Sequence, residues 1–172
     1  MANLIIYYSR SGENYVDGKV RSLVKGNSEI CAEILCRHFG GDLFRIETEK
    51  EYPSNYIECI EVAKREKNEG ARPTLKKYLD DISGYDNVFV VGPCWWGTFP
   101  CAVFTQLEKL DFTGKKVLVV MTHEGSGLGD TVEDVKKACP GAELVEGFAV
   151  HGAEAAESEF PLHNWVVSVL GK

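Results

Sequence analysis

Three loops, each directly after a short apolar run, contain the side chains of this sequence that could bind a ligand. The first loop begins at Ser9-Arg10-Ser11 and meets a helix-period pattern only after Gly26-Asn27-Ser28. Hydroxyl groups and the free N–H groups of a helix N-terminus suit a phosphate, and the helix dipole adds partial positive charge there. We therefore expect a phosphate site with Arg10 as its cation and with side-chain donors from Ser9, Ser11, Asn27 and Ser28.

The second loop contains two adjacent tryptophans between glycine and proline residues. It reads Gly92-Pro93-Cys94-Trp95-Trp96-Gly97-Thr98-Phe99-Pro100. Neighbouring side chains point in different directions, so two adjacent indoles are difficult to bury in one core. Contact with a planar ligand explains the tryptophan pair better. In the alternative, one tryptophan packs on the next helix and only the other meets ligand or solvent.

The third loop, from Thr122 to Gly129, is rich in glycine, which lets the backbone approach a ligand closely. It lacks the dinucleotide-binding fingerprint, because position 130 is aspartate. His123 and Glu124 could form an acid–base pair, but residues adjacent in sequence rarely face each other. We favour contact of the backbone and of His123 with a ligand ring.

Apolar runs that alternate with helix-period segments predict the elements that position these loops. Five runs are expected as strands: Leu4–Tyr8, Leu43–Ile46, Val88–Val91, Val117–Met121 and Leu144–Val150. Helices are expected at Ser28–Phe39, Ser54–Lys67, Pro100–Leu110, from an N-cap at Asp130 to Cys139, and at Pro161–Leu170. This alternation is typical of an α/β protein, a three-layer, doubly wound sandwich around a parallel sheet. Residues 1–172 are expected to form one domain.

Composition excludes several classes of function. The net charge of −7, from 26 acidic and 19 basic residues, argues against nucleic-acid binding. The acidic charge could steer docking to a basic protein partner, or could serve solubility alone. The six cysteines form no C-x-x-C pair, so we expect reduced thiols and no metal site. With no membrane-length apolar run and no signal-peptide pattern at the start, we expect a cytoplasmic protein without membrane insertion.

At the three loops the sequence resembles the flavodoxin-like family of FMN-binding proteins. The matching segments are Y-Y-S-R-S-G, G-P-C-W-W-G-T-F-P and T-H-E-G-S-G-L-G. The resemblance implies a five-stranded parallel sheet in the order 2-1-3-4-5 and a non-covalently bound FMN. It implies a phosphate at the first loop, beside Ser9, Arg10 and Ser11. It implies an isoalloxazine ring between two walls, one of Pro93, Cys94, Trp95, Trp96 and Gly97, the other of Thr122, His123, Glu124, Gly125 and Gly127.

The first loop departs from the pattern of this family, because an insertion near residues 12–25 separates its two halves. We expect Asn27 and Ser28 to complete the phosphate site. In the rival arrangement, Gly12-Glu13-Asn14 completes the site and the helix starts earlier.

The resemblance implies redox chemistry and leaves three kinds of function open. The first is an electron carrier that exchanges electrons with partner proteins, and this is the function we favour. The second is an FMN-dependent oxidoreductase that uses NAD(P)H to reduce a small acceptor such as a quinone. The third is a non-redox, flavin-binding regulatory module. None of them requires a catalytic side chain, since the flavin carries the electron chemistry.

Overall fold

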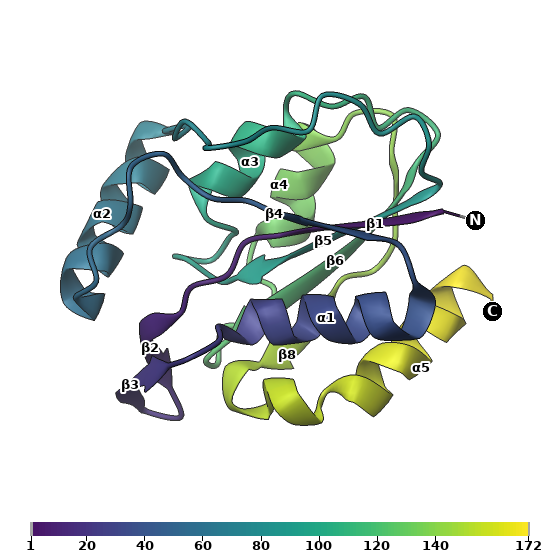
Figure 1. Ribbon diagram of the computed structural model, residues 1–172. Coiled ribbons are helices and arrows are strands. Elements are labelled where there is room, and N and C mark those ends of the chain that lie inside the picture. The colour runs from purple at the N-terminus through teal and green to yellow at the C-terminus, as the bar shows by residue number, and fades with distance from the viewer. Residues whose placement is uncertain (1, 172) are drawn as a thin grey trace.

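The computed structural model describes residues 2–171, and a parallel sheet runs through its centre (Figure 1). Four strands follow one another across the sheet: β4 (Asp42–Arg45), β1 (Asn3–Tyr7), β5 (Asn87–Pro93) and β6 (Lys116–His123). Two short segments, β7 (Glu143–Leu144) and β8 (Phe148–His151), both pair with β6 on its outer side. Counting these two segments as the fifth strand, the order is 2-1-3-4-5, which confirms the expected topology.

Helices cover both faces of the sheet and complete the three layers. On one face lie α1 (Asn27–Phe39) and α5 (Glu159–Leu170), and on the other α3 (Cys101–Leu107) and α4 (Thr131–Ala138). A 3₁₀ helix, η1 (Gly152–Glu157), precedes α5. The remaining helix, α2 (Tyr56–Glu69), stands beyond the carboxyl ends of the strands, at the left of Figure 1.

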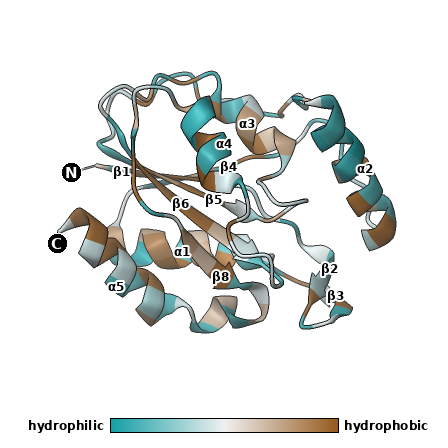
Figure 2. Cartoon of the chain, turned by 180° about the vertical axis from the view of Figure 1, so that it is seen from behind, coloured by the Kyte–Doolittle hydropathy of each residue, from teal (hydrophilic) through white to brown (hydrophobic). Residues whose placement is uncertain are grey.

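The strands form because their apolar residues can be buried on both faces. In β1, Leu4 and Ile6 pack toward α3 and α4, while Ile5 and Tyr7 pack toward α1 and α5. Alternate side chains of a strand point to opposite faces, so a nearly continuous apolar run serves two cores. Figure 2 shows the result, with apolar strands in the middle and polar colour on the outer sides of the helices.

The last strand differs from the expected continuous segment Leu144–Val150. Val117 pairs with Leu144, but Val120 pairs with Phe148, so three residues of the edge strand oppose two residues of β6. The extra residue is a bulge, which interrupts pairing at a sheet edge. Within the bulge, Gly147 lies against side chains from the α4 region, where an added Cβ would be 3.0 Å from Val132.

The insertion forms a β-hairpin of two antiparallel strands, β2 (Gly12–Val16) and β3 (Lys19–Leu23). Its two-residue turn consists of Asp17 and Gly18, both with positive φ (52° and 78°). Two positive φ values match the right-handed twist of the flanking strands. Because residues 12–14 belong to β2, the rival prediction of an early helix start is wrong, and α1 begins at Asn27.

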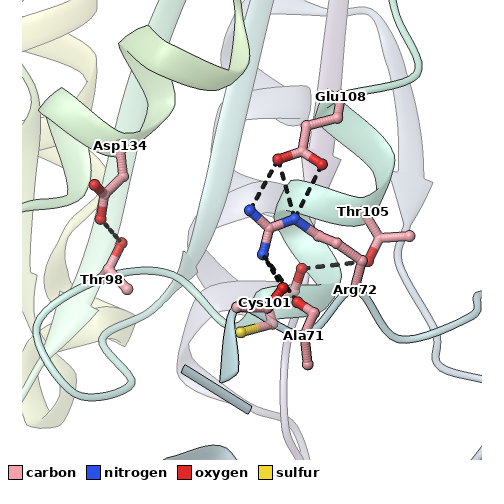
Figure 3. A network of polar contacts seen from close by, with 8 residues as sticks. Ala71, Arg72, Thr98, Cys101, Thr105, Glu108 and Asp134 are labelled. Atoms are coloured by element: carbon pink, nitrogen blue, oxygen red, sulfur yellow. Dashed lines mark hydrogen bonds and ion pairs between the residues drawn. The ribbon is translucent and has the colours of Figure 1, made fainter. Parts of the chain in front are cut away.

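An arginine holds the segment that follows α2 against α3. Arg72 makes a forked ion pair with Glu108, with N–O distances of 2.9–3.0 Å, and donates to the carbonyl of Ala71 at 2.9 Å (Figure 3). Its guanidinium also lies 5.6 Å from the centre of the Phe104 ring. Among residues 2–171, no helix combines the length and the apolar character needed to cross a bilayer.

Candidate functional site

A cavity of about 390 Å³ opens at the carboxyl ends of β1, β5 and β6. The chain passes from β1 to β4 on one side and returns to β5 on the other, so the strand order reverses between β1 and β5. Ligands of doubly wound sheets bind at this reversal. The cavity is lined by most of the residues that the sequence predicts for a ligand site: Arg10, Asn27, Ser28, Pro93, Cys94, Trp95, Trp96, Gly97, Thr122, His123 and Glu124.

Four of the expected site residues are not brought to the walls of this cavity. Gly125 and Gly127 belong to the loop after β6 but not to its cavity-lining surface. Ser9 and Ser11 line a neighbouring cavity of about 500 Å³ instead. The hydroxyl of Ser9 already accepts the backbone N–H of Glu29 at 3.1 Å. Ser9 therefore satisfies a donor in the first turn of α1 rather than facing the ligand space.

Arg10 lines both cavities, and its guanidinium is used to hold backbone. It donates to the carbonyl oxygens of Glu13, Pro53 and Ser54 at 2.9–3.0 Å. The hairpin and the segment before α2 are tied together by these bonds. Arg10 adds positive charge near the start of α1, but most of its directed donors are taken.

The start of α1 offers unused donors to the cavity. Within residues 2–171, the backbone N–H groups of Asn27 and Ser28 have no hydrogen-bond acceptor, as is usual for a first helical turn. The Ser28 hydroxyl is 2.8 Å from the Thr122 hydroxyl, which links α1 to the end of β6. These groups form a polar end of the cavity suited to an anion.

Close packing at Gly26 brings this helix start to the end of β1. A Cβ on Gly26 would lie 2.1 Å from Ser9 Oγ and 2.5 Å from the Arg10 carbonyl oxygen. The φ of Gly26 is −66°, which any residue can adopt, so steric contact alone requires glycine here.

The two tryptophans divide their contacts between protein and cavity. Trp95 packs edge-on against Tyr8 and Tyr52, with ring centroids 5.2 and 5.0 Å apart. Trp96 has a positive φ of 59° and donates its indole N–H to the carbonyl of Ile60 in α2 at 2.9 Å. Both rings also line the cavity, and Trp96 is bonded to α2, which precedes this loop, rather than to the next helix of the chain.

Hydrogen bonds fix the tryptophan loop to its neighbours. Cys94 N–H donates to the carbonyl of Thr122, and Asp130 N–H to that of Gly97, both at 2.8 Å. The Thr98 hydroxyl donates to Asp134 of α4 at 2.7 Å (Figure 3). Asp130 is the N-cap residue of α4 as predicted, but its side chain makes no capping hydrogen bond.

The loop after β6 contains a cluster of ionisable groups. His123 and His151 meet edge to face, with centroids 5.7 Å apart. His123 Nδ1 accepts the N–H of Gly125 at 2.9 Å, so the neutral ring carries its proton on Nε2. Burial, and then the charge of His151, lower the pKa of His123, against an opposing effect of Glu124.

Glu124 joins this loop to the hairpin. Its Oε2 accepts the N–H of Asp17 at 2.9 Å and lies 3.7 Å from His151 Nε2. Its Oε1 is buried without a hydrogen-bond partner in the described part of the chain. His123 and Glu124 thus interact with other residues instead of forming an acid–base pair.

The sequence analysis did not predict several parts of the cavity wall, which come from the hairpin, from α2, from the loop after β6 and from the residue after β8. These residues are Tyr15, Tyr56, Cys59, Ile60, Ala63, Ser126 and Gly152, whereas Asn14, which also lines the cavity, belonged to the rival arrangement of the first loop. The α2 members have the spacing of one helix face, which was visible in the sequence, but nothing there indicated that this face borders a cavity. No group of three metal-ligating side chains occurs among residues 2–171.

Fold and cavity together define a doubly wound α/β protein with a ligand site at the strand-order reversal. The chain belongs to the flavodoxin family, because the family model described as flavodoxin matches residues 19–169. No curated protein matches the sequence.

Several solved structures are similar to the chain. A protein of Bacteroides eggerthii DSM 20697, provisionally assigned as a flavoprotein, is 26% identical, with a TM-score of 0.79 and 99% of both chains covered. Another such protein, from Bacteroides uniformis ATCC 8492, is 21% identical, with a TM-score of 0.75, covering 96% of this chain and 97% of that one. A flavoprotein of Lactobacillus acidophilus NCFM, solved in complex with FMN, is 18% identical, with a TM-score of 0.62 over 91% and 97%. The similarity to the Bacteroides uniformis and Lactobacillus acidophilus structures shows a shared fold.

Replacing Gly26 with alanine should destabilise the protein, because the new methyl group overlaps Ser9 and Arg10. Overpacking of this kind costs about 1–3 kcal/mol in the free energy of unfolding, measurable by urea denaturation. Gly84→Ala is the matched control, since its φ is not positive and no atom lies within 4 Å of its added Cβ. Equal unfolding free energies for the two variants would contradict the packing argument.

His123 should titrate below the ordinary histidine pKa of 6.5, as observed by NMR of its ring protons. Removing the neighbouring charge with His151→Asn should raise this pKa, and Glu124→Gln should lower it. The folded state binds fewer protons than the unfolded state between the lowered pKa and 6.5, so this histidine makes stability rise with pH there. An unchanged His123 titration in both variants would contradict this account.

Proposed function

We propose that this protein binds FMN non-covalently and transfers electrons through it. The observation that carries the proposal is the cavity at the strand-order reversal, with free helix N–H groups at one end and two tryptophans along its wall. Membership of the flavodoxin family supports the cofactor. The FMN complex of the Lactobacillus acidophilus protein, which shares the fold, agrees with it.

The residues of the cavity suit both the phosphate and the ring of FMN. A phosphate needs several donors, which the first turn of α1 and the side chains of Asn27 and Ser28 can provide. A flat, largely apolar ring needs aromatic and backbone surfaces, which Trp95, Trp96 and the loop after β6 can provide. The volume of about 390 Å³ lies within the usual range of cofactor sites, about 300–1,000 Å³.

The chemistry would come from the flavin ring, which accepts and releases electrons when bound. The protein's own groups would bind, orient and tune it. Asn27 and Ser28 would hold the phosphate, and the two indoles would exclude water from the ring. The carboxylate of Glu124 stands at the cavity wall, where it would oppose any added negative charge on a neighbouring group.

The donor and acceptor of these electrons define two candidate functions. A carrier would exchange electrons with partner proteins, for which the net charge of −7 offers complementarity to a basic surface. An NAD(P)H-dependent reductase would pass them to a small molecule such as a quinone. The hairpin and α2 favour this second candidate, because they add walls to the cavity beyond the three loops of the sheet.

Replacing Ser28 with alanine should weaken FMN binding by about 10- to 150-fold, because a hydrogen bond to a charged phosphate contributes about 1.5–3 kcal/mol. The dissociation constants of FMN and riboflavin, measured by quenching of flavin fluorescence, provide the test. Riboflavin lacks the phosphate, so its affinity should change little. Ser168→Ala, which removes an exposed hydroxyl on α5, is the matched control. A protein that binds no FMN would overturn the proposal, and an unchanged FMN affinity in Ser28→Ala would remove Ser28 from the phosphate site.

The FMN-loaded protein should oxidise NADPH slowly. Among the described residues that line the cavity, Arg10 is the only lysine or arginine, and its guanidinium is bound to three carbonyl oxygens. The phosphates of NADPH would therefore find no free cation there. NADPH absorbance at 340 nm, followed with and without a quinone, measures the rate, and dithionite provides a control for a reducible flavin. Rapid NADPH oxidation stimulated by the quinone would decide for the reductase.

A further inference from the structure

We infer that the outer part of the cavity is a second binding site, for a small, planar, uncharged aromatic molecule. This inference rests on the proposed function, which assigns the phosphate of FMN to the inner, polar part and its ring to the two tryptophans, so that Trp96 would border both ligands. The outer site is built by the hairpin, by one face of α2 and by Trp96. It would place an aromatic electron acceptor, or another flat ligand, beside the cofactor.

The cavity walls change character with depth. At the inner end, Ser28 and Thr122 are 2% and 5% exposed, and their hydroxyls are bonded to each other. At the outer end, Tyr15 and Trp96 are each 43% exposed. The inner part is therefore closed and polar, whereas the outer part is aromatic and open to solvent.

One face of α2 supplies an apolar wall to the outer part. Tyr56, Cys59, Ile60 and Ala63 have the spacing i, i+3, i+4 and i+7, which brings them onto one side of a helix. Figure 2 shows the apolar residues of α2 gathered toward its N-terminal half, near the hairpin. In a globular domain such a face is normally covered by the core, but here it borders a cavity.

The aromatic rings of the outer part are held in place before any ligand arrives. Tyr15 of the hairpin stacks on Tyr56, with centroids 6.2 Å apart and ring planes inclined by 22°. Trp96 is fixed by its bond to the Ile60 carbonyl and by the ammonium of Lys64, 5.2 Å from the centre of the indole ring. Preorganised rings lose little side-chain entropy when they contact a ligand, so flat faces at this opening favour a flat ligand.

The hairpin is anchored on both sides of the opening. Near its base, Glu13 accepts the N–H of Tyr56 at 2.6 Å, and at its tip Asp17 donates to Glu124 at 2.9 Å. These two bonds reach α2 and the loop after β6, so the hairpin spans from one wall of the cavity to another. The position of Tyr15 is thereby fixed from both ends.

Most of the charged donors around the outer part are already bonded to protein carbonyls, which favours an uncharged ligand over an anionic one. Arg10 is bound to three carbonyls, and Lys67 donates to the Trp96 carbonyl. Glu124 accepts the N–H of Asp17. An anionic ligand would lose hydration and would find only the exposed ammonium of Lys64 near the Trp96 ring, so its binding is disfavoured in a partly closed site.

The test is a titration of the FMN-saturated protein with 2-naphthol by isothermal calorimetry. Two probes of the same skeleton serve as controls: decahydro-2-naphthol, which is saturated and not planar, and 2-naphthoate, which is charged. We expect 2-naphthol to bind at least tenfold more tightly than either control. None of the probes requires a reductant, so binding is measured without turnover.

Variants then locate the binding of 2-naphthol. Tyr15→Leu should weaken it about three- to tenfold, as expected for the loss of one aromatic contact, whereas Tyr15→Phe should retain it. Phe160→Leu, an equally aromatic but exposed position on α5, is the matched control and should have no effect. The FMN dissociation constant of each variant is measured first, so that every titration is performed at saturation.

The outcomes separate this inference from the proposed function. If FMN binds but the three probes bind alike, or Tyr15→Leu leaves 2-naphthol binding unchanged, the outer site is overturned and the FMN proposal stands. If FMN does not bind, the proposed function fails, and the division of the cavity into two parts fails with it.

Discussion

The contact of Gly26 with the Ser9 hydroxyl and the Arg10 backbone is the constraint on which the site depends. The chain leaves the sheet at the end of β1, forms a hairpin, and must return to the same point before α1 can begin. It returns so closely that no side chain fits at position 26, and the Ser9 hydroxyl accepts a backbone N–H of the helix. As a result, the first residues of α1, Asn27 and Ser28, line the cavity although the hairpin separates them from β1 in sequence.

The hairpin depends on the rest of the protein for its own stability. An isolated two-stranded hairpin is marginally stable in water at best. Here its turn is bonded to Glu124, and Tyr15 and Glu13 contact Tyr56 of α2. Because the hairpin, α2 and the loop after β6 are joined in this way, the shape of the cavity is determined by contacts between segments far apart in sequence.

The parallel sheet could be predicted because its strands are nearly continuous apolar runs, which suit burial on both faces. The hairpin could not be predicted from hydrophobicity, since β2 and β3 are mostly polar and its exposed Val20 covers no core. Its turn, Asp17-Gly18, was the available signal. The bulge in the last strand depends on close packing of Gly147 against Leu128 and Val132, which no local pattern encodes.

The loops of the site were predictable because parallel strands end at a common edge, whereas the direction of each side chain was not. Ser9 and Ser11 lie next to Arg10 in sequence, but they line only the neighbouring cavity, whereas Arg10 lines both. The apolar spacing of α2 indicates a covered face without indicating what covers it. The same close approach at Gly26 that brings α1 to the inner end also fixes the point to which the chain returns after the hairpin that contains Tyr15. The polar and the aromatic ends of the cavity are therefore not independent, because a shift of the chain at Gly26 would displace both.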